Sequence, residues 1–419
     1  MAQFSKILKN RNFFCLWLSQ IISQFGDRLN QMALIGLIYH RAPGSTLELA
    51  KLMTFTIVPV FLIGPAAGVY VDRWDRRRTM FICDFLKCLL VILIPLLFIN
   101  CSSLLPVYII VFLVFSLSRF YVPAKMSIIP DLVKPEDLLL ANSLANTTGM
   151  IAAVLGFGLG GLIVAAAGVR YGFYINALTF FFSAFLIFLI TKPVVIKREA
   201  IIEVGKEVIE VIRKSVVTEF KEGLRYLLNH RQIRSTVNML FVLWLALGAV
   251  YVIVIVFVQE SLHTVTEGLG FLAMFLGMGL FLGALAYGRF GPRGKQFKVI
   301  FTSLIASGIM LAAFALLVHT IGSFLLAALL SLALGFTVSP IMTAANTLVH
   351  EASSAKMRGK VFSNFEIIMH LAFLLAMLGS AALAERCSRL CILVGVGMVL
   401  VGVGIWGFVT EKKNYGKAA

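Results

Sequence analysis

The sequence predicts an all-α membrane protein in which twelve transmembrane helices form two six-helix halves. Three observations support this fold class. Of the 419 residues, 60% are hydrophobic and only 14% are charged, whereas soluble domains carry about 25% charged residues. Apolar runs of about 20 residues, enough to cross a ~30 Å hydrocarbon core as a helix, recur along the whole chain. Finally, a polar segment at 192–234 separates six such runs from six more.

The first half begins with a short basic tail and continues through six apolar runs. We expect spans at about 13–38, 49–71, 79–99, 104–122, 138–166 and 171–191. Pro43 and Gly44 predict an outer loop between the first two spans, and Gly168-Val169-Arg170 predicts a tight outer turn before the sixth. The two prolines of the segment Pro123–Val133 favour an inner connection after span four.

The second half repeats this scheme after the polar segment. We expect spans at about 235–258, 267–288, 298–318, 323–345, 361–383 and 389–409. This organisation predicts an N-terminal bundle at 1–191, a cytoplasmic linker at 192–234 and a C-terminal bundle at 235–419. Within the linker, apolar side chains fall on one helical face, which indicates an amphipathic helix on the inner leaflet. These side chains are Phe220, Leu224, Leu227 and Leu228.

The net charge of +17 reflects membrane topology. Most of the 37 Lys and Arg fall in alternate connections and in the two termini, as the positive-inside rule requires. No aromatic-basic platform accompanies them, so we expect no nucleic-acid partner. Both termini should be cytoplasmic, and the chain should cross the inner membrane many times.

The polar residues do not suggest an enzyme. No nucleophile with a base, paired carboxylates or Cys/His metal pattern emerges, and no Walker-type glycine loop supports ATP-driven work. Of the six cysteines, Cys101 and Cys387 should lie near the outer face. Whether these two form a disulfide cannot be deduced from their spacing.

A dense charged turn between spans two and three carries the strongest motif. It reads Gly68-Val-Tyr-Val-Asp72-Arg73-Trp-Asp75-Arg76-Arg77-Arg78. The pattern Gly-x-x-x-Asp-Arg-x-x-Arg-Arg resembles the loop after the second span in the major facilitator superfamily of secondary transporters, although Asp75 stands where that motif usually has a second glycine. The resemblance implies two six-span halves that hold substrate between them near the bilayer midplane.

The resemblance also implies an inner gate, because in this superfamily the charged turn docks on the inner end of span eleven. Glu366 could then pair with Arg73 or Arg76. His370, one helical turn further along, leaves two alternatives open, a proton relay or plain packing. Arg119 of span four could reach the inner surface or the acids of the turn. The predicted gating set is Gly68, Asp72, Arg73, Arg76, Arg77, Arg119, Glu366 and His370.

Charges inside spans are costly, so each is a functional candidate. Asp27 lies in the middle of span one and could be a structural partner of Arg28 or another span, or a cavity carboxylate that binds a cation or a proton. Arg28 is a poor partner, because neighbours on a helix point about 100° apart. Phe25-Gly26-Asp27 and Pro123-Ala124-Lys125 resemble the bacterial lysophospholipid transporters of this superfamily, which implies that Asp27 and Lys125 meet a zwitterionic headgroup. The predicted substrate or ion site is therefore Asp27, Arg28 and Lys125.

Two further patterns favour structural roles. Asp84 and Lys87 in span three are three residues apart and can neutralise one another. The glycines of span five resemble the antiporter motif of drug exporters, with Phe157 in place of its proline, but small residues also permit close packing against another span.

Together these features predict a monomeric secondary transporter without a cofactor, which moves a small amphipathic molecule by alternating access and uses a proton or sodium gradient. The charged turn resembles macrolide-efflux and siderophore-export relatives, so drug or siderophore export stands beside inward flipping of lysophospholipid. A non-transporting membrane receptor with the same fold is the alternative from another class. Membrane lipids would surround the chain.

Overall fold

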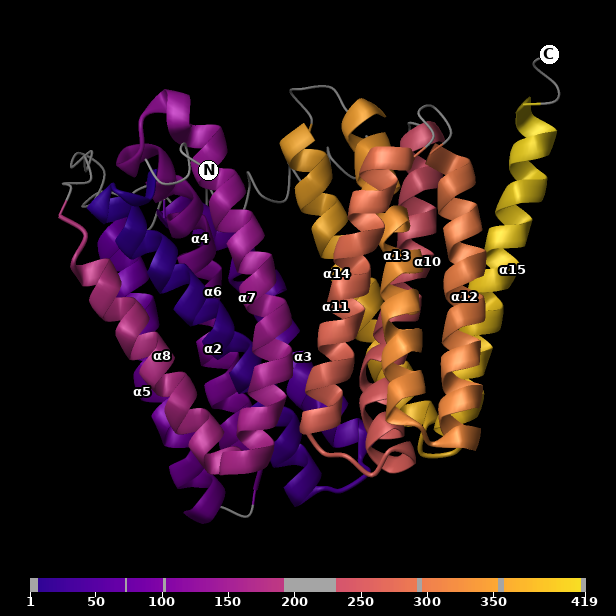
Figure 1. Cartoon of the computed structure of the whole chain (residues 1–419), viewed down its shortest axis with the longest axis horizontal. Helices are drawn as coiled ribbons and strands as arrows, with labels where there is room; N and C mark the ends of the chain where they lie inside the picture. The colour runs from indigo at the N-terminus through magenta and orange to yellow at the C-terminus, as the bar shows by residue number, and fades with distance from the viewer. Residues whose placement is uncertain are drawn as a thin grey trace. The chain divides into compact units, whose positions relative to one another are not determined.

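A computed structural model describes residues 7–71, 74–100, 103–191, 231–291, 296–352 and 358–415. The described backbone is helical and contains no strand. In the first half, the helices are α2 (Arg11–Arg41), α3 (Thr46–Leu62), α4 (Gly64–Val71), α5 (Arg76–Asn100), α6 (Leu105–Leu132), η1 (Pro135–Asp137), α7 (Leu138–Ala167) and α8 (Val169–Phe188). Figure 1 shows these helices from indigo to magenta.

The second half contains six long helices, drawn from pink to yellow in Figure 1. They are α10 (Arg231–Ser261), α11 (Glu267–Phe290), α12 (Gln296–Ile321), α13 (Phe324–Ala352), α14 (Arg358–Leu383) and α15 (Arg389–Tyr415). When α3 and α4 are counted as one interrupted span, the described residues form the twelve long helices that the sequence predicts.

Ten of the described helices are long and apolar enough to cross a membrane by themselves. The two other predicted spans fall outside this set for identifiable reasons. Helix α2 carries polar and charged side chains along its length, and α3 has 17 residues before the chain is interrupted. Helix α2 nevertheless packs along α7 and α8, and α4, the second part of span two, packs against α6.

The chain divides into two compact units. The first contains Met1–Arg41 and Leu52–Val216, and the second contains Ala42–Lys51 and Val217–Ala419. The short loop after α2 thus groups with the second unit, where Arg389 Nη2 donates to the Gly44 carbonyl at 2.6 Å and Arg389 Nη1 donates to both Glu260 carboxylate oxygens at 2.7 and 2.8 Å. Gly44 has φ +72°, a conformation that glycine adopts without strain.

Span two is interrupted, where the sequence predicts one continuous helix. Helix α3 ends at Leu62 and α4 begins at Gly64, with a turn at Ile63 between them. Pro65 has no N–H to donate to the Phe61 carbonyl, so the regular ladder fails at this point. Helical hydrogen bonding resumes directly after the interruption, because Ala67 N still donates to the Ile63 carbonyl at 2.9 Å.

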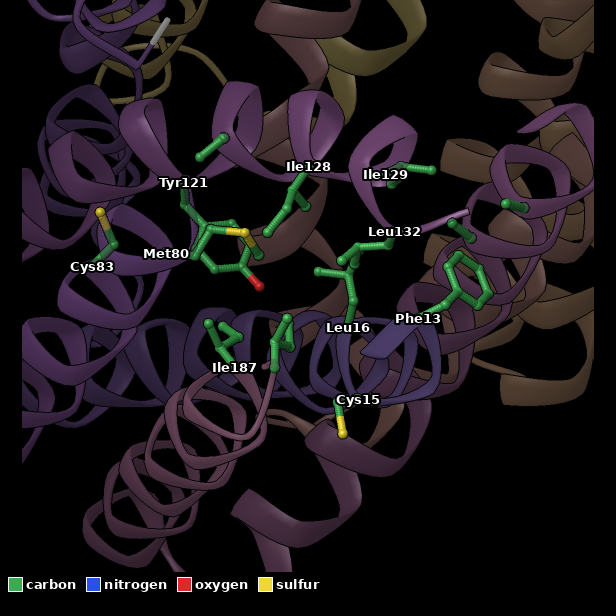
Figure 2. Packing of buried hydrophobic residues seen from close by; sticks show 14 of the residues in the cluster. Phe13, Cys15, Leu16, Met80, Cys83, Tyr121, Ile128, Ile129, Leu132 and Ile187 are labelled. Atoms are coloured by element: carbon green, nitrogen blue, oxygen red, sulfur yellow. The ribbon is translucent and has the colours of Figure 1, made fainter. Parts of the chain in front are cut away.

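The predicted inner loop Pro123–Val133 is wrong, because α6 continues as a helix to Leu132. The reason is packing: Ala124, Ile128 and Leu132 lie one turn apart and are buried in an apolar cluster with residues of α2, α5, α7 and α8. Figure 2 shows Leu132 pointing toward Leu16 of α2 and Ile128 lying beside Tyr121. Burial of this stripe outweighs the local penalty of the two prolines inside the helix.

The tight outer turn before span six is also shorter than predicted. Helix α7 ends at Ala167 and α8 begins at Val169, so Gly168 alone reverses the chain. Gly168 has φ +91° and its N–H donates to the Val164 carbonyl at 2.9 Å. Only glycine adopts such a conformation readily, which explains its place in this turn.

Several predicted features lie outside the described residues. These are the linker helix with Phe220, Leu224, Leu227 and Leu228, two gating residues of the charged turn, Asp72 and Arg73, and the outer Cys101.

Candidate functional site

Asp27 lies midway along α2, sixteen residues after its first residue Arg11. Its side chain is exposed. The cations that attract this carboxylate are Lys87 of α5, Arg28 of its own helix and Lys125 of α6, in decreasing order. An exposed carboxylate at this depth of a membrane helix needs water or polar partners around it, since contact with lipid tails costs several kcal/mol.

The glycines of α7 determine how α2 is held. A Cβ on Gly156 would lie 3.0 Å from Arg28 Cβ, and one on Gly160 would lie 3.0 Å from Leu29 Cα. Helix α2 therefore lies directly against this glycine face, which agrees with the packing interpretation of the span-five motif. Phe157, which replaces the proline of that motif, lies beneath the guanidinium of Arg28, 4.9 Å from its ring centre.

This packing turns Arg28 away from Asp27. The Arg28 guanidinium stacks on Phe157 and donates through Nη1 to Gln31 Oε1 at 3.3 Å. Lys125 is half-buried on α6. Within the described parts of the chain neither Asp27 nor Lys125 forms an ion pair, so the two charges attract one another without direct contact.

Close to this pair lies a fully buried charge cluster. Lys87 Nζ is 3.5 Å from Asp84 Oδ1, and the Ser183 hydroxyl donates to Asp84 Oδ2 at 2.6 Å. The Lys87 ammonium also lies over two ring faces, 4.7 Å from the Tyr121 centre and 5.2 Å from the Phe180 centre. The predicted Asp84–Lys87 pairing is confirmed, and the cluster joins α5, α6 and α8.

Ser183, Tyr121 and Phe180 were not predicted from the sequence as members of this cluster. A serine or an aromatic residue in an apolar run carries no signal that it faces a charge on another helix. The only available hint was Lys87 itself, because a lysine within a span requires more than one neutralising group.

The described part of the charged turn is structural in this conformation. Asp75 Oδ1 accepts from the N–H of Arg78 at 3.0 Å, which makes Asp75 the N-cap of α5. This role explains why an acid suits the position where the superfamily motif has glycine. Arg76 Nη1 donates to Asp131 Oδ2 at 2.6 Å and to the Ser127 carbonyl at 2.9 Å, and thereby joins α5 to the end of α6.

Arg77 binds the other neighbour of α5. Its Nε donates to the Ile187 carbonyl at 3.3 Å and its Nη2 donates to the Phe188 carbonyl, so the guanidinium caps the C-terminus of α8. Gly68 lies in α4 and Arg119 lies half-buried in α6. Their proposed gating roles stay predictions.

The predicted gate residues of span eleven lie on α14. Glu366 is exposed and forms no ion pair within the described parts of the chain. Four residues on, His370 Nδ1 donates to the Glu366 carbonyl at 2.8 Å and its ring lies 5.3 Å from that of Trp244 on α10. Since Arg76 is bonded to Asp131 here, pairing of Glu366 with Arg76 also stays a prediction.

Cysteine and metal chemistry add little to the site. Cys387 is a free, exposed thiol. Among the residues that the structure describes, no group of three His, Cys, Asp or Glu side chains could hold a metal ion.

Comparison with known proteins agrees with this helical architecture. The model of the Major Facilitator Superfamily matches residues 16–297, more than half of the chain. The chain therefore belongs to the Major Facilitator Superfamily, and it is a multi-pass membrane protein of this bacterial type.

The relatives include an uncharacterised MFS-type transporter, YfiS of Bacillus subtilis, which is 29% identical over 220 residues. That match covers 52% of this chain and 49% of YfiS, so it spans about half the length of this relative. Macrolide efflux protein A of Streptococcus pyogenes is 23% identical over 385 residues, and the match covers 89% of this chain and 89% of that protein. Among solved structures, a mutant of the nucleoside transporter NupG superposes with a TM-score of 0.73 at 12% identity, and the match covers 95% of this chain and 100% of the NupG chain, a likeness of fold.

Proposed function

We propose that this protein is a secondary active exporter of a small amphipathic molecule, driven by a proton or sodium gradient across the cytoplasmic membrane. The observation that carries the proposal is Asp27, an exposed carboxylate halfway along a membrane helix, with Lys87 and Lys125 as its cationic neighbours. A carboxylate in this position of a membrane helix costs free energy. Asp27 is not needed as a structural counter-ion for Lys87, because Asp84 already neutralises Lys87.

The direction of transport rests on the relatives. Macrolide efflux protein A matches across 89% of both chains, which supports export of a bulky, mostly apolar molecule with a polar group. The described residues offer few charges to such a cargo within the membrane. Asp27 and Lys125 can therefore recognise a polar or charged group, while apolar helix surfaces accept the remainder of the molecule.

In the proposed mechanism, the protein alternates between two states, and cargo and ion must bind them with different affinities. The contacts of the charged turn belong to one of these states. Arg76 with Asp131 and Arg77 with the end of α8 fix the start of α5, and Glu366 is available as an alternative partner for a turn arginine. We further propose that the protein acts as a monomer with both termini in the cytoplasm.

A lysophospholipid is the second candidate cargo. It is favoured by the opposite charges of Asp27 and Lys125, which attract one another without direct contact and could accept the two charges of a zwitterionic headgroup. A receptor without transport activity is the remaining alternative. It gains no support from the site, because a receptor does not need an unpaired carboxylate within a membrane helix.

Purified protein reconstituted in liposomes tests these proposals. We expect efflux of a labelled macrolide or a dye under a pH or sodium gradient. The efflux rate of Asp27→Asn should be lower by a factor of about ten or more, which corresponds to about 1.4 kcal/mol of lost interaction. Glu267→Gln, at the exposed first turn of α11, serves as the matched control. Movement of labelled lysophospholipid alone would favour the second cargo. Movement of no cargo under any gradient would favour the receptor, and an unchanged Asp27→Asn would refute the role of this carboxylate.

A further inference from the structure

We propose that α10 and α14 carry a binding site for organic cations, formed by the rings of Trp244, Tyr251 and Phe373 and by the carboxylate of Glu366. The inference rests on the proposed function, because it specifies one class of cargo for the transporter. It concerns the second unit alone and uses residues other than Asp27 and Lys125.

The residues of this cation site follow helical spacing on two packed helices. On α10, Trp244, Gly248 and Tyr251 fall at i, i+4 and i+7, so they share one face. On α14, Glu366 and Phe373 stand seven residues apart with His370 between them, again on one face.

The two faces meet ring to ring. Phe373 lies 6.1 Å from Trp244 at an angle of 71° and 5.4 Å from Tyr251 at 59°, both measured between ring centres. Trp244 also lies 5.3 Å from the His370 ring. The three aromatic residues thus form one continuous row across the two helices.

Gly248 makes this arrangement possible. A Cβ at Gly248 would lie 2.2 Å from the Phe373 carbonyl oxygen, so any larger residue would force the helices apart. Trp244, Tyr251 and Phe373 are each half-buried. The uncovered surface of Trp244 and Phe373 is where a ligand would make contact.

The charge of the site comes from Glu366. Its side chain is exposed and forms no ion pair within the described residues. Glu366 stands one helical turn before His370, whose ring lies against Trp244. The hydrogen bond from His370 Nδ1 to the Glu366 carbonyl holds the histidine ring in place against Trp244.

This combination selects a ligand by charge and shape. A cation is attracted to aromatic faces, best of all to tryptophan, and the carboxylate adds attraction of the same sign. An anion of equal size meets repulsion from both. The predicted ligand is therefore a bulky monovalent organic cation, with an apolar body that contacts the ring row and a positive centre near Glu366.

Tetraphenylphosphonium and tetraphenylborate test the inference, because they match in shape and differ in the sign of their charge. Equilibrium binding of each is measured on the full-length protein in lipid nanodiscs. We expect saturable binding of the cation and none of the borate. Glu366→Gln and Trp244→Leu should each weaken cation binding about tenfold, Trp244→Phe should restore most of the affinity, and Trp406→Leu, an exposed tryptophan on α15, should leave it unchanged.

Three results would overturn the inference: equal binding of borate and phosphonium, absence of cation binding by the wild-type protein, or unchanged affinity in both Glu366→Gln and Trp244→Leu. The failure of the inference can be told apart from failure of the proposed function. Gradient-driven efflux that persists in liposomes while phosphonium fails to bind leaves the transporter assignment intact. Loss of efflux in Asp27→Asn with unchanged phosphonium affinity supports two separate sites.

Discussion

Substitution of Lys87 by methionine tests how the charges inside the first unit are balanced. The side chain of Lys87 is 2% exposed and that of Asp84 is fully buried. Methionine retains the apolar length of lysine and removes the ammonium group. The variant therefore leaves the Asp84 carboxylate with Ser183 as its remaining direct partner in the cluster.

The expected loss is large. Removal of one partner from a buried ion pair typically costs about 3–5 kcal/mol, because the other charge remains buried without compensation. The substitution also removes the contacts of the ammonium group with the Tyr121 and Phe180 rings, and such desolvated cation–π contacts contribute about 2 kcal/mol. These contributions overlap, so we expect a decrease of about 3–5 kcal/mol in the free energy of unfolding. The double variant Asp84→Leu with Lys87→Met should recover most of this loss, because no charge is left buried.

The chain offers a matched control. Glu48 and Lys51 of α3 have the same three-residue spacing and a shorter contact of 2.7 Å, but Lys51 is 46% exposed. Lys51→Met should cost less than about 1 kcal/mol. Unfolding titrations in mixed detergent micelles would measure the wild type and these three variants. The reasoning is refuted if Lys87→Met is as stable as the wild type, or if the double variant is as unstable as Lys87→Met alone.

Individual contacts give three further predictions. Gly248→Val should strongly lower the thermal stability and the protein yield, since the valine side chain would meet the Phe373 backbone. Gly379→Ala is the control and should be tolerated, because no atom lies within 4 Å of the new Cβ; thermal unfolding compares the two variants. Asp75→Ala should cost about 1 kcal/mol of unfolding free energy through loss of the α5 N-cap, and Asp75→Asn should retain most of it; equal stability of the Ala and Asn variants would contradict the cap. Cys387, kept as the single cysteine, should react with a membrane-impermeant maleimide added outside intact cells; labelling only after lysis would reverse the predicted topology.

Length, hydropathy and charge order predicted the helical architecture well. Eleven of the predicted spans correspond to continuous helices, since about 20 apolar residues in a membrane must satisfy their backbone hydrogen bonds internally. The errors about where a helix is interrupted lie at prolines. Pro65 interrupts the second span, while Pro123 and Pro130 do not interrupt α6, and local propensity gives no means of telling these cases apart.

The candidate site was predicted less completely. Asp27 and Lys87 stood out because a charge in an apolar run is rare, and spacing alone suggested the Asp84–Lys87 pair. Lys125 stood out only through the resemblance of Pro123-Ala124-Lys125 to lysophospholipid transporters. Spacing could not show that Asp75 caps α5, that Arg77 caps α8 or that Phe157 supports Arg28. Each of these contacts depends on the rotation of one helix about its axis or on the exact end of another.

The sequence by itself determined that this protein spans a membrane with twelve helices, and which few charges those helices carry. The reason is that the cost of burying a polar group in lipid acts on each segment separately, whatever its neighbours are. The tertiary structure decided what each charge meets. It enclosed Lys87 between Asp84, Tyr121 and Phe180, left Asp27 and Glu366 exposed, and aligned the rings of α10 and α14. Such pairings join residues far apart in the chain, and they depend on close helix contacts at glycines such as Gly156 and Gly248.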